Sequence, residues 1–176
     1  HYPTYFIADI AANHDGDLGR AFRLIELAKE SGADAAKFQN FIADKIVSSN
    51  GFSDMKGQVS HQSGWKKSVF EVYEDASIDW DWTEKLYEKC KEVGIEYFTS
   101  PYDFLSVDHV YKYVNVYKIG SGDLTWHDII NYISKKGKPV LIATGASTLE
   151  EVELAMGVLE KENNGIVLMQ CNTNYT

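Results

Sequence analysis

Arginine is nearly absent from this chain, and its basic residues gather nowhere beyond two Lys-Lys pairs. Arg20 and Arg23 carry the guanidinium groups, and the formal net charge at pH 7 is −9 over 176 residues. Proteins that bind nucleic acids or anionic membranes depend on clustered Lys and Arg. We therefore expect neither a nucleic-acid partner nor a membrane partner.

Cysteine and long apolar runs are also scarce. Cys90 and Cys171 lie far apart in unlike contexts, so we expect no disulfide framework and a reducing, cytoplasmic location. No apolar stretch approaches the roughly 20 residues that span a bilayer, and we expect no leader segment. The first residue is His1 rather than Met, from which we expect a trimmed or processed chain.

Glycine-rich phosphate loops of the GxGxxG or Walker type are missing, but strands and helices alternate throughout. Apolar runs predict six strands, over residues 5–11, 34–41, 95–102, 114–122, 138–145 and 165–175. Helical spacing predicts helices over 18–32, 81–94, from about 104, over 126–137 and over 147–161, the last capped by Ser147 or Thr148. No hairpin signal joins the strands, which indicates a parallel sheet with helical crossovers.

Polar residues recur where each predicted strand ends. They are Asn13 with His14, Lys37 with Gln39, Ser100 with Asp103, Lys118 with Ser121, Thr144, and Asn172 through Tyr175. A doubly wound sheet and a (β/α)₈ barrel both accept this order, but convergence of such residues on one mouth is typical of the barrel. We therefore predict an α/β (β/α)₈ TIM barrel, of which residues 1–176 supply the first six βα units. The two remaining units are expected beyond Thr176.

A long interruption separates the second predicted strand from the helix that follows it. Residues 42–77 are too many for an ordinary βα connection, and loops of this length often serve as lids or partner surfaces. Trp65, Phe70 and Tyr73 could pack back as a small helix. Plain packing and a substrate-covering role are both open, and we favour packing.

Two lysines interrupt apolar strands, in "DAAKFQNF" and "YKIGSGDLTW". Lys37 and Lys118 could extend to solvent or pair with a carboxylate on a neighbouring strand. Alternatively, two ammonium groups near one barrel axis would share an anion, such as a phosphate or carboxylate. Ser100, Ser121 and Thr144 would add hydroxyl donors to that anion. A Schiff-base role would explain one lysine but not two.

Six segments occur in the order seen in the sialic acid synthase family, which this chain resembles. They are "FIADIAANHDG", "GADAAKFQNF", "YFTSPYDF", "YKIGSGDLT", "KPVLIATGAS" and "CNTNY". The resemblance implies a transferase that condenses phosphoenolpyruvate with N-acetylmannosamine or a related acylated amino sugar. It also implies a TIM barrel followed by a small antifreeze-like C-terminal domain, expected beyond Thr176, and a homodimer.

The resemblance also assigns the site. It implies that Lys37, Lys118, Ser100, Ser121 and Thr173 hold phosphoenolpyruvate, that Gln39 and Tyr175 lie near the sugar, and that Asp9 contacts the sugar's reacting end. The family usually has a longer Glu at the position of Asp9 and a Ser at that of Ala143. We therefore expect the sugar side of the site to differ from the common pattern.

The histidines give no metal-ligand spacing in this chain. His14, in "NHDG" beside Asn13, is expected to touch the ligand, although turn formation by that segment is the alternative. His109 and His127 are expected to be surface or packing residues. The resemblance implies a divalent cofactor, Mn²⁺ or Mg²⁺, held by two histidines beyond Thr176, and so no metal ligand within these residues.

Three other functions remain open at this point. One is another phosphoenolpyruvate-dependent 2-keto-3-deoxy sugar acid synthase, such as an octulosonate or heptulosonate phosphate synthase. A second is a Schiff-base aldolase, and a third is a truncated, inactive barrel that acts as a binding protein.

Overall fold

Strands and helices alternate along the chain as the sequence predicts. The computed structural model describes residues 2–48, 50–51, 65–162 and 165–173. Its elements are β1 (Ile7–Ala11), α1 (Leu18–Glu30), β2 (Ala35–Asn40), α2 (Ala43–Ile46), α4 (Val69–Ala76), α5 (Trp80–Val93), β3 (Glu96–Pro101), α6 (Phe104–Val110), β4 (Tyr117–Ile119), the 3₁₀ helix η2 (Ser121–Asp123), α7 (His127–Ser134), β5 (Val140–Ala143), α8 (Leu149–Leu159) and β6 (Ile166–Met169).

The strands form two parallel three-stranded sheets, in the orders β1-β2-β3 and β4-β5-β6, with β3 lying beside β4. All four paired ladders are parallel. The predicted parallel α/β class is therefore confirmed, whereas the described residues do not close into a barrel. The strand predicted over 114–122 shortens to Tyr117–Ile119: residues 114–116 are not strand, and at the other end the chain turns into η2 directly after Gly120.

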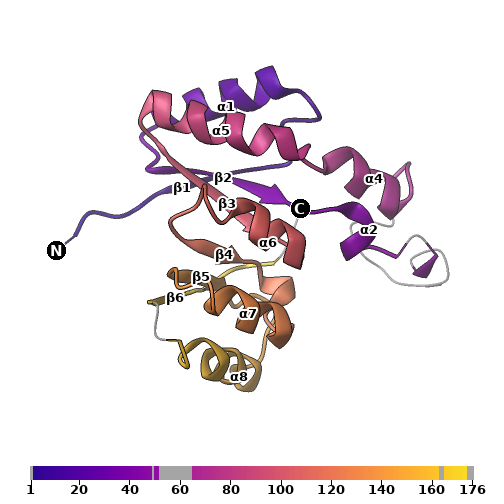
Figure 1. The fold of residues 1–176 in the computed structure, drawn as a ribbon, viewed down its shortest axis with the longest axis vertical. Helices are drawn as coiled ribbons and strands as arrows, with labels where there is room; N and C mark the ends of the chain where they lie inside the picture. The colour runs from indigo at the N-terminus through magenta and orange to yellow at the C-terminus, as the bar shows by residue number, and fades with distance from the viewer. Residues whose placement is uncertain (1, 49, 52–64, 163–164, 174–176) are drawn as a thin grey trace.

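One face of each sheet is covered by helices, and the core lies there. Helices α1 and α5 cover β1, β2 and β3, while α7 and α8 lie beside β5 and β6 (Figure 1). Phe38, Tyr117 and Ile142 are fully buried in this core. Because successive side chains of a strand point to opposite faces, Lys37 and Lys118 project from the face without helices.

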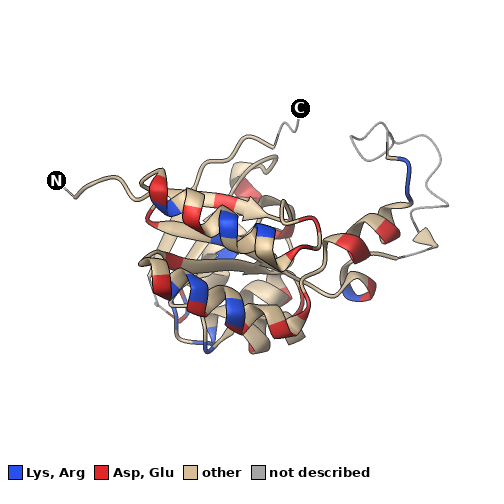
Figure 2. Ribbon diagram, turned by 90° about the horizontal axis from the view of Figure 1, so that it is seen from above, with Lys and Arg blue, Asp and Glu red and all other residues tan. Residues whose placement is uncertain are grey.

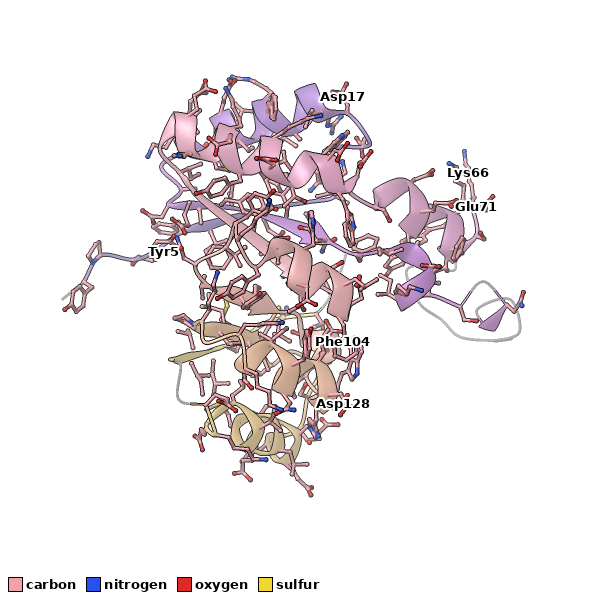
Figure 3. The ribbon with its side chains drawn as sticks, in the orientation of Figure 1. Tyr5, Asp17, Lys66, Glu71, Phe104 and Asp128 are labelled. Carbon is pink, nitrogen blue, oxygen red and sulfur yellow. The ribbon has the colours of Figure 1, made fainter. Side chains whose placement is uncertain are left out.

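Helix ends follow local sequence signals. Thr148 caps α8, and its hydroxyl accepts from the backbone N–H of Glu151, whose carboxylate bonds back to Thr148. Gly94 ends α5 in the left-handed conformation, with φ of 72°, as expected of a glycine after a helix. The small helix predicted near Phe70 and Tyr73 is present as α4, and its start carries a second capping box, between Ser68 and the Glu71 labelled in Figure 3.

Charges of both signs are interspersed along the outer helices (Figure 2). Arg23, for example, bonds Glu26 and Glu30 on its own helix, at 3.0 and 2.9 Å. Among the described helices, none combines the length and the apolar character needed to cross a membrane.

Candidate active site at the carboxyl ends of the strands

A cavity of about 920 Å³ opens where several strands end. Residues that follow β2, β3, β4, β5 and β6 line it, together with residues from α2 and α4. Its lining is Gln39, Phe41, Lys45, Ile46, Val47, Tyr73, Tyr102, Gly120, Ser121, Gly122, Asp123, Thr125, Trp126, Gly145, Ala146, Ser147, Glu151 and Thr173. The carboxyl ends of parallel strands are where α/β folds place their ligand sites.

Lys37 is buried and paired. Its side chain is 9% exposed, and its ammonium lies 2.9 Å from the carboxylate of Asp9 on the neighbouring strand β1. The two residues are direct partners in the β1–β2 register, so they share one face of the sheet. The pairing with a neighbouring carboxylate that the sequence left open is therefore present for Lys37.

Lys118 is also buried, and its Nζ donates a 2.7 Å hydrogen bond to the carbonyl of Ile119. Burial, together with the positive charge of Lys37, lowers the pKa of Lys118 to about 8. The negative charges of Asp9 and Asp123 oppose this shift. The charge of Lys37 thus reaches Lys118, and Asp9 pairs with Lys37 while its charge also favours the protonated form of Lys118.

Asp123 is a site residue to which the sequence analysis gave no role. It lines the cavity from η2, and burial raises its pKa to about 6, against the lowering effect of Lys118. Its position five residues after a buried lysine, in "YKIGSGDLT", was the signal that could have identified it. A carboxyl with this pKa can release or accept a proton near neutral pH.

Ser121, Gly145 and Thr173 meet in the cavity. The hydroxyl of Ser121 accepts a 3.0 Å hydrogen bond from the backbone N–H of Gly145. A Cβ at Gly145 would lie 2.5 Å from Cγ2 of Thr173 and 2.8 Å from the carbonyl of Cys171. Only glycine therefore lets these three loops approach so closely, and the structure brings the predicted Ser121 and Thr173 together.

Gln39 lines the cavity beside Tyr102. Its amide Nε2 donates to the Tyr102 hydroxyl at 3.3 Å. Ser100 is the register partner of Gln39 on β3 and is 1% exposed. Tyr102 was not predicted, although it follows directly on the "SP" that ends β3.

Asn13, His14 and Thr144 lie outside the cavity lining and make local contacts. The Asn13 amide donates to the carbonyl of Ile10 at 2.9 Å. His14 is completely buried; its Nδ1 accepts from the Gly16 N–H at 3.1 Å, and burial lowers its pKa. Thr144 donates its hydroxyl to the Met169 carbonyl at 3.2 Å. These contacts favour the turn-forming interpretation for Asn13 and His14 and a strand-bridging role for Thr144.

His109 and His127 belong to helices, as expected, and one predicted site residue cannot be placed. His109 lies within α6, and His127 begins α7. Tyr175 lies outside the described residues. Among the residues that are described, no three His, Cys, Asp or Glu side chains are grouped as a metal site. The described residues therefore do not fit a resident metal.

The long segment between β2 and α5 contributes directly to the cavity. Lys45, Ile46 and Val47 from α2 and its end, and Tyr73 from α4, line the wall. The Tyr73 ring packs on Phe41 at 5.7 Å. Plain packing, the interpretation favoured from the sequence, is thus incomplete, because the described ends of this segment also shape the cavity.

Comparison with known proteins places most of the chain in the family that the six sequence segments resemble. The sequence profile of the NeuB family matches residues 24–176. N,N'-diacetyllegionaminic acid synthase of Campylobacter jejuni is 32% identical over 98% of this chain and 52% of its own length. Pseudaminic acid synthase of the same species is 30% identical over 98% of this chain and 50% of its own length.

Solved structures agree on the fold. The N-acetylneuraminic acid synthetase of Leptospira borgpetersenii superposes with a TM-score of 0.86 at 23% identity, covering 99% of this chain and 56% of that one. The chain spans about half the length of the curated relatives it matches. The chain belongs to the NeuB family.

Proposed function

We propose that the protein containing this chain condenses phosphoenolpyruvate with an acylated amino sugar, releasing phosphate and a nonulosonic, sialic-type acid. One observation carries the proposal: Lys37 and Lys118 are both buried, the charge of Lys37 lowers the pKa of Lys118, and Gln39 and Ser121, two and three residues further along the chain, line the cavity at the strand ends. Two like charges held close together disfavour each other, and a bound anion would offset that repulsion. Membership of the NeuB family supports the same reaction.

Phosphoenolpyruvate supplies the anion that this arrangement needs. Lys37 and Lys118 would bind and orient its phosphate and carboxylate, an electrostatic role. Ser100, Ser121 and Thr173 would add hydroxyl groups, of which the last two line the cavity. On binding, the anion would replace Asp9 as the partner of Lys37 and leave the Asp9 carboxylate for the sugar.

The reaction forms one C–C bond and exchanges the C2–O bond to phosphate for a C2–O bond to the oxygen of water. C3 of phosphoenolpyruvate attacks the open-chain aldehyde, whose oxygen takes up a proton. Water adds to C2 and loses one proton to leave a hydroxyl; the C2–O bond to phosphate then breaks, the hydroxyl proton passes to the departing phosphate, and C2 becomes the ketone. Asp123, which lines the cavity and has a pKa of about 6, would accept the proton from water. No covalent bond to either lysine is required.

The wider architecture is part of the proposal. The six βα units would be the first part of a (β/α)₈ barrel, followed by the remaining units and a small antifreeze-like domain, in a cytoplasmic homodimer. A divalent cofactor, Mn²⁺ or Mg²⁺, would take its ligands from outside the described residues, so no step above is assigned to it.

A phosphate-release assay tests the function. The full-length protein is mixed with phosphoenolpyruvate, Mn²⁺ and a panel of N-acylated amino sugars, and the keto-acid product is identified by mass. We expect sugar-dependent release that falls by at least about 100-fold in Lys118→Ala. Unchanged release by Lys118→Ala would contradict the role of that lysine, and release only with sugar phosphates that carry no acylamino group would favour the octulosonate or heptulosonate type of synthase.

Borohydride trapping with a keto acid separates the aldolase alternative. The proposed reaction predicts no stable adduct on Lys37 or Lys118, because neither forms a Schiff base. A protein that binds phosphoenolpyruvate but never releases phosphate would instead be the inactive binding protein.

A further inference from the structure

Asp103 is a buried carboxylate that the proposed reaction does not use. It follows β3, is 4% exposed, and is the N-cap residue of α6. Its Oδ1 accepts a 2.8 Å hydrogen bond from the backbone N–H of Ser106, as a capping residue should. Burying a charged group is costly unless hydrogen bonds compensate for the lost water. The burial of this carboxylate therefore needs an explanation beyond the cap.

Other aspartates cap helices of this fold without being buried. Asp17 caps α1 and Asp79 caps α5, each through Oδ1 and each from an exposed position. One carboxylate oxygen therefore suffices for a cap. In Asp103 the second oxygen is also bonded: Oδ2 accepts from the Ser106 hydroxyl at 2.6 Å and from the backbone N–H of Ile42 at 3.2 Å. The bond to Ile42 joins two segments that lie 61 residues apart in the chain.

Ile42 is the residue at which the chain leaves β2 for α2. It is the N-cap residue of this four-residue helix, but its side chain makes no capping hydrogen bond. Figures 1 and 2 show α2 and α4 projecting beyond the body of the fold. The Asp103 carboxylate supplies a bond at this junction from outside the helix, and so ties the start of α2 to the end of β3.

The strand before Ile42 is fixed on its core side. Asn40, the last residue of β2, is 1% exposed. Its amide donates to the Thr83 hydroxyl on α5 at 3.1 Å and accepts from the Thr99 hydroxyl on β3 at 2.6 Å. The end of β2 is thus bonded to its neighbours on two elements. The position of α2 relative to this frame is set directly afterwards, where Asp103 bonds Ile42.

The residues that follow Ile42 shape the cavity. Lys45 and Ile46 line it from α2, and Val47 lines it from the end of that helix. The contacts proposed for phosphoenolpyruvate come from the strand ends and the loops after them, and none comes from α2. This helix is therefore left to face the amino sugar, which would share the cavity.

We propose that Asp103 is a positioning residue, whose bond to Ile42 holds α2 against the cavity and thereby sets the affinity for the amino sugar. The proposal rests on the proposed function and adds to it the residue that fixes one wall of the site. Asp103 itself touches no substrate, because it acts through α2.

Two substitutions separate the bond to Ile42 from the cap of α6. Serine is a good N-cap residue with one short side-chain oxygen, so Asp103→Ser should keep the cap and lose the bond to Ile42. Ser106→Ala is the matched control, since it removes a hydroxyl from the same carboxylate and leaves both backbone bonds. If Asp103→Ser folds poorly, Asp103→Thr makes the same test, because threonine also caps helices.

Amide hydrogen exchange on the full-length protein measures the bond directly. The Ile42 amide should exchange at least about tenfold faster in Asp103→Ser, since a hydrogen bond to a charged group is lost. Its exchange rate should be unchanged in Ser106→Ala. This readout needs no substrate, so it is independent of the proposed reaction.

Steady-state phosphate release measures the effect on the site. With the acylated amino sugar that is turned over fastest in the panel, Asp103→Ser should raise the KM for the sugar by roughly three- to tenfold. The reason is that α2 would occupy its binding position for only part of the time. The KM for phosphoenolpyruvate and kcat should change little, and Ser106→Ala should leave all three values unchanged. A merely structural role would lower the amount of active protein, which reduces kcat and leaves both KM values as they are.

Unchanged exchange at Ile42 in Asp103→Ser would overturn the proposal. So would an unchanged KM for the sugar, or an equal rise in the KM values of both substrates. In each case the unmodified protein still releases phosphate and the proposed function stands. If the unmodified protein releases no phosphate, the proposed function fails and the role of Asp103 in sugar binding fails with it. Exchange at Ile42 then still shows whether Asp103 holds α2.

Discussion

The ammonium of Lys37 and the carboxylate of Asp9 lie 2.9 Å apart, on neighbouring strands and on the same face of the sheet. Lys37 is almost fully buried, whereas the Asp9 side chain is 61% exposed. Asp9 also acts electrostatically on Lys118. One accessible carboxylate therefore pairs with one buried ammonium and favours the charged form of the other.

Asp9→Asn should separate binding from turnover. Without this carboxylate, Lys37 has no competing anionic partner on β1, so phosphoenolpyruvate should bind at least as tightly as before. Turnover should fall by about 100-fold or more, because the group proposed to face the sugar is lost. Titration calorimetry and phosphate release measure the two quantities. Asp9→Glu keeps the charge and is the control. If Asp9→Asn weakens phosphoenolpyruvate binding as much as Lys37→Ala does, the proposed exchange of Asp9 for the ligand as the partner of Lys37 is contradicted.

Phosphoenolpyruvate affinity should depend on pH through Lys118. This lysine is charged below a pKa of about 8 and neutral above it. The KM for phosphoenolpyruvate should therefore rise by up to about tenfold between pH 8 and 9. Lys118→Arg, whose guanidinium stays charged, should remove the rise. Lys138→Arg, at the opposite end of β5, is the control and should retain it.

Lys118 should also cost the unliganded protein stability. Its pKa is lowered from 10.5 to about 8 in the folded state, mainly by burial. The folded state therefore binds the proton less well than the unfolded state. The resulting loss of folding free energy is complete below about pH 8. It shrinks as pH rises and vanishes above 10.5, the pKa of Lys118 in the unfolded state.

Lys118→Met should accordingly raise the free energy of unfolding by up to about 3 kcal/mol at pH 7. The gain should be smaller at pH 10, where the native lysine is already neutral when folded. Chemical denaturation of the full-length protein at both pH values measures it. A destabilised Lys118→Met at pH 7 would show that the lysine is satisfied without a ligand.

Asp123 should set the acid side of the activity profile. Its pKa of about 6 means that the carboxylate, the form able to accept a proton, is lost as pH falls through 6. We expect kcat to decline below that pH, and Asp123→Asn to lower kcat by about 100-fold and remove the acid limb. Asp128→Asn, on the exposed start of α7, is the control. An acid limb that persists in Asp123→Asn would assign the proton to another group.

Two glycines in neighbouring segments should respond to alanine in opposite ways. At Gly145 a Cβ would meet Thr173 at 2.5 Å and the Cys171 carbonyl at 2.8 Å, so Gly145→Ala should force the loops apart and reduce both stability and activity. Gly157 lies in the exposed interior of α8 with nothing within 4 Å. Gly157→Ala should stabilise the protein by about 0.5–1 kcal/mol with unchanged kinetics. Thermal melting and phosphate release compare the two variants. A Gly145→Ala protein that is stable and active would contradict the close approach of Gly145 to Thr173 and Cys171.

Local pattern was enough to predict the elements, because it reflects forces that act over a few residues. Apolar periodicity located the strands and major helices, and the capping signal at Thr148 and the stop at Gly94 were confirmed. The strand over 114–122 was predicted too long, since apolar character alone does not reveal where the backbone turns into η2.

Residue types and motif order by themselves were enough to predict the family. They also identified four candidate site residues: Lys37, Lys118, Gln39 and Ser121. Only the tertiary structure decided which side chains meet. It paired Lys37 with Asp9, added Asp123 and Tyr102 to the site, and directed His14 into the core instead of the cavity. The physical reason is that burial and contact across strands distant in sequence set charge, pKa and orientation, and no local pattern encodes them.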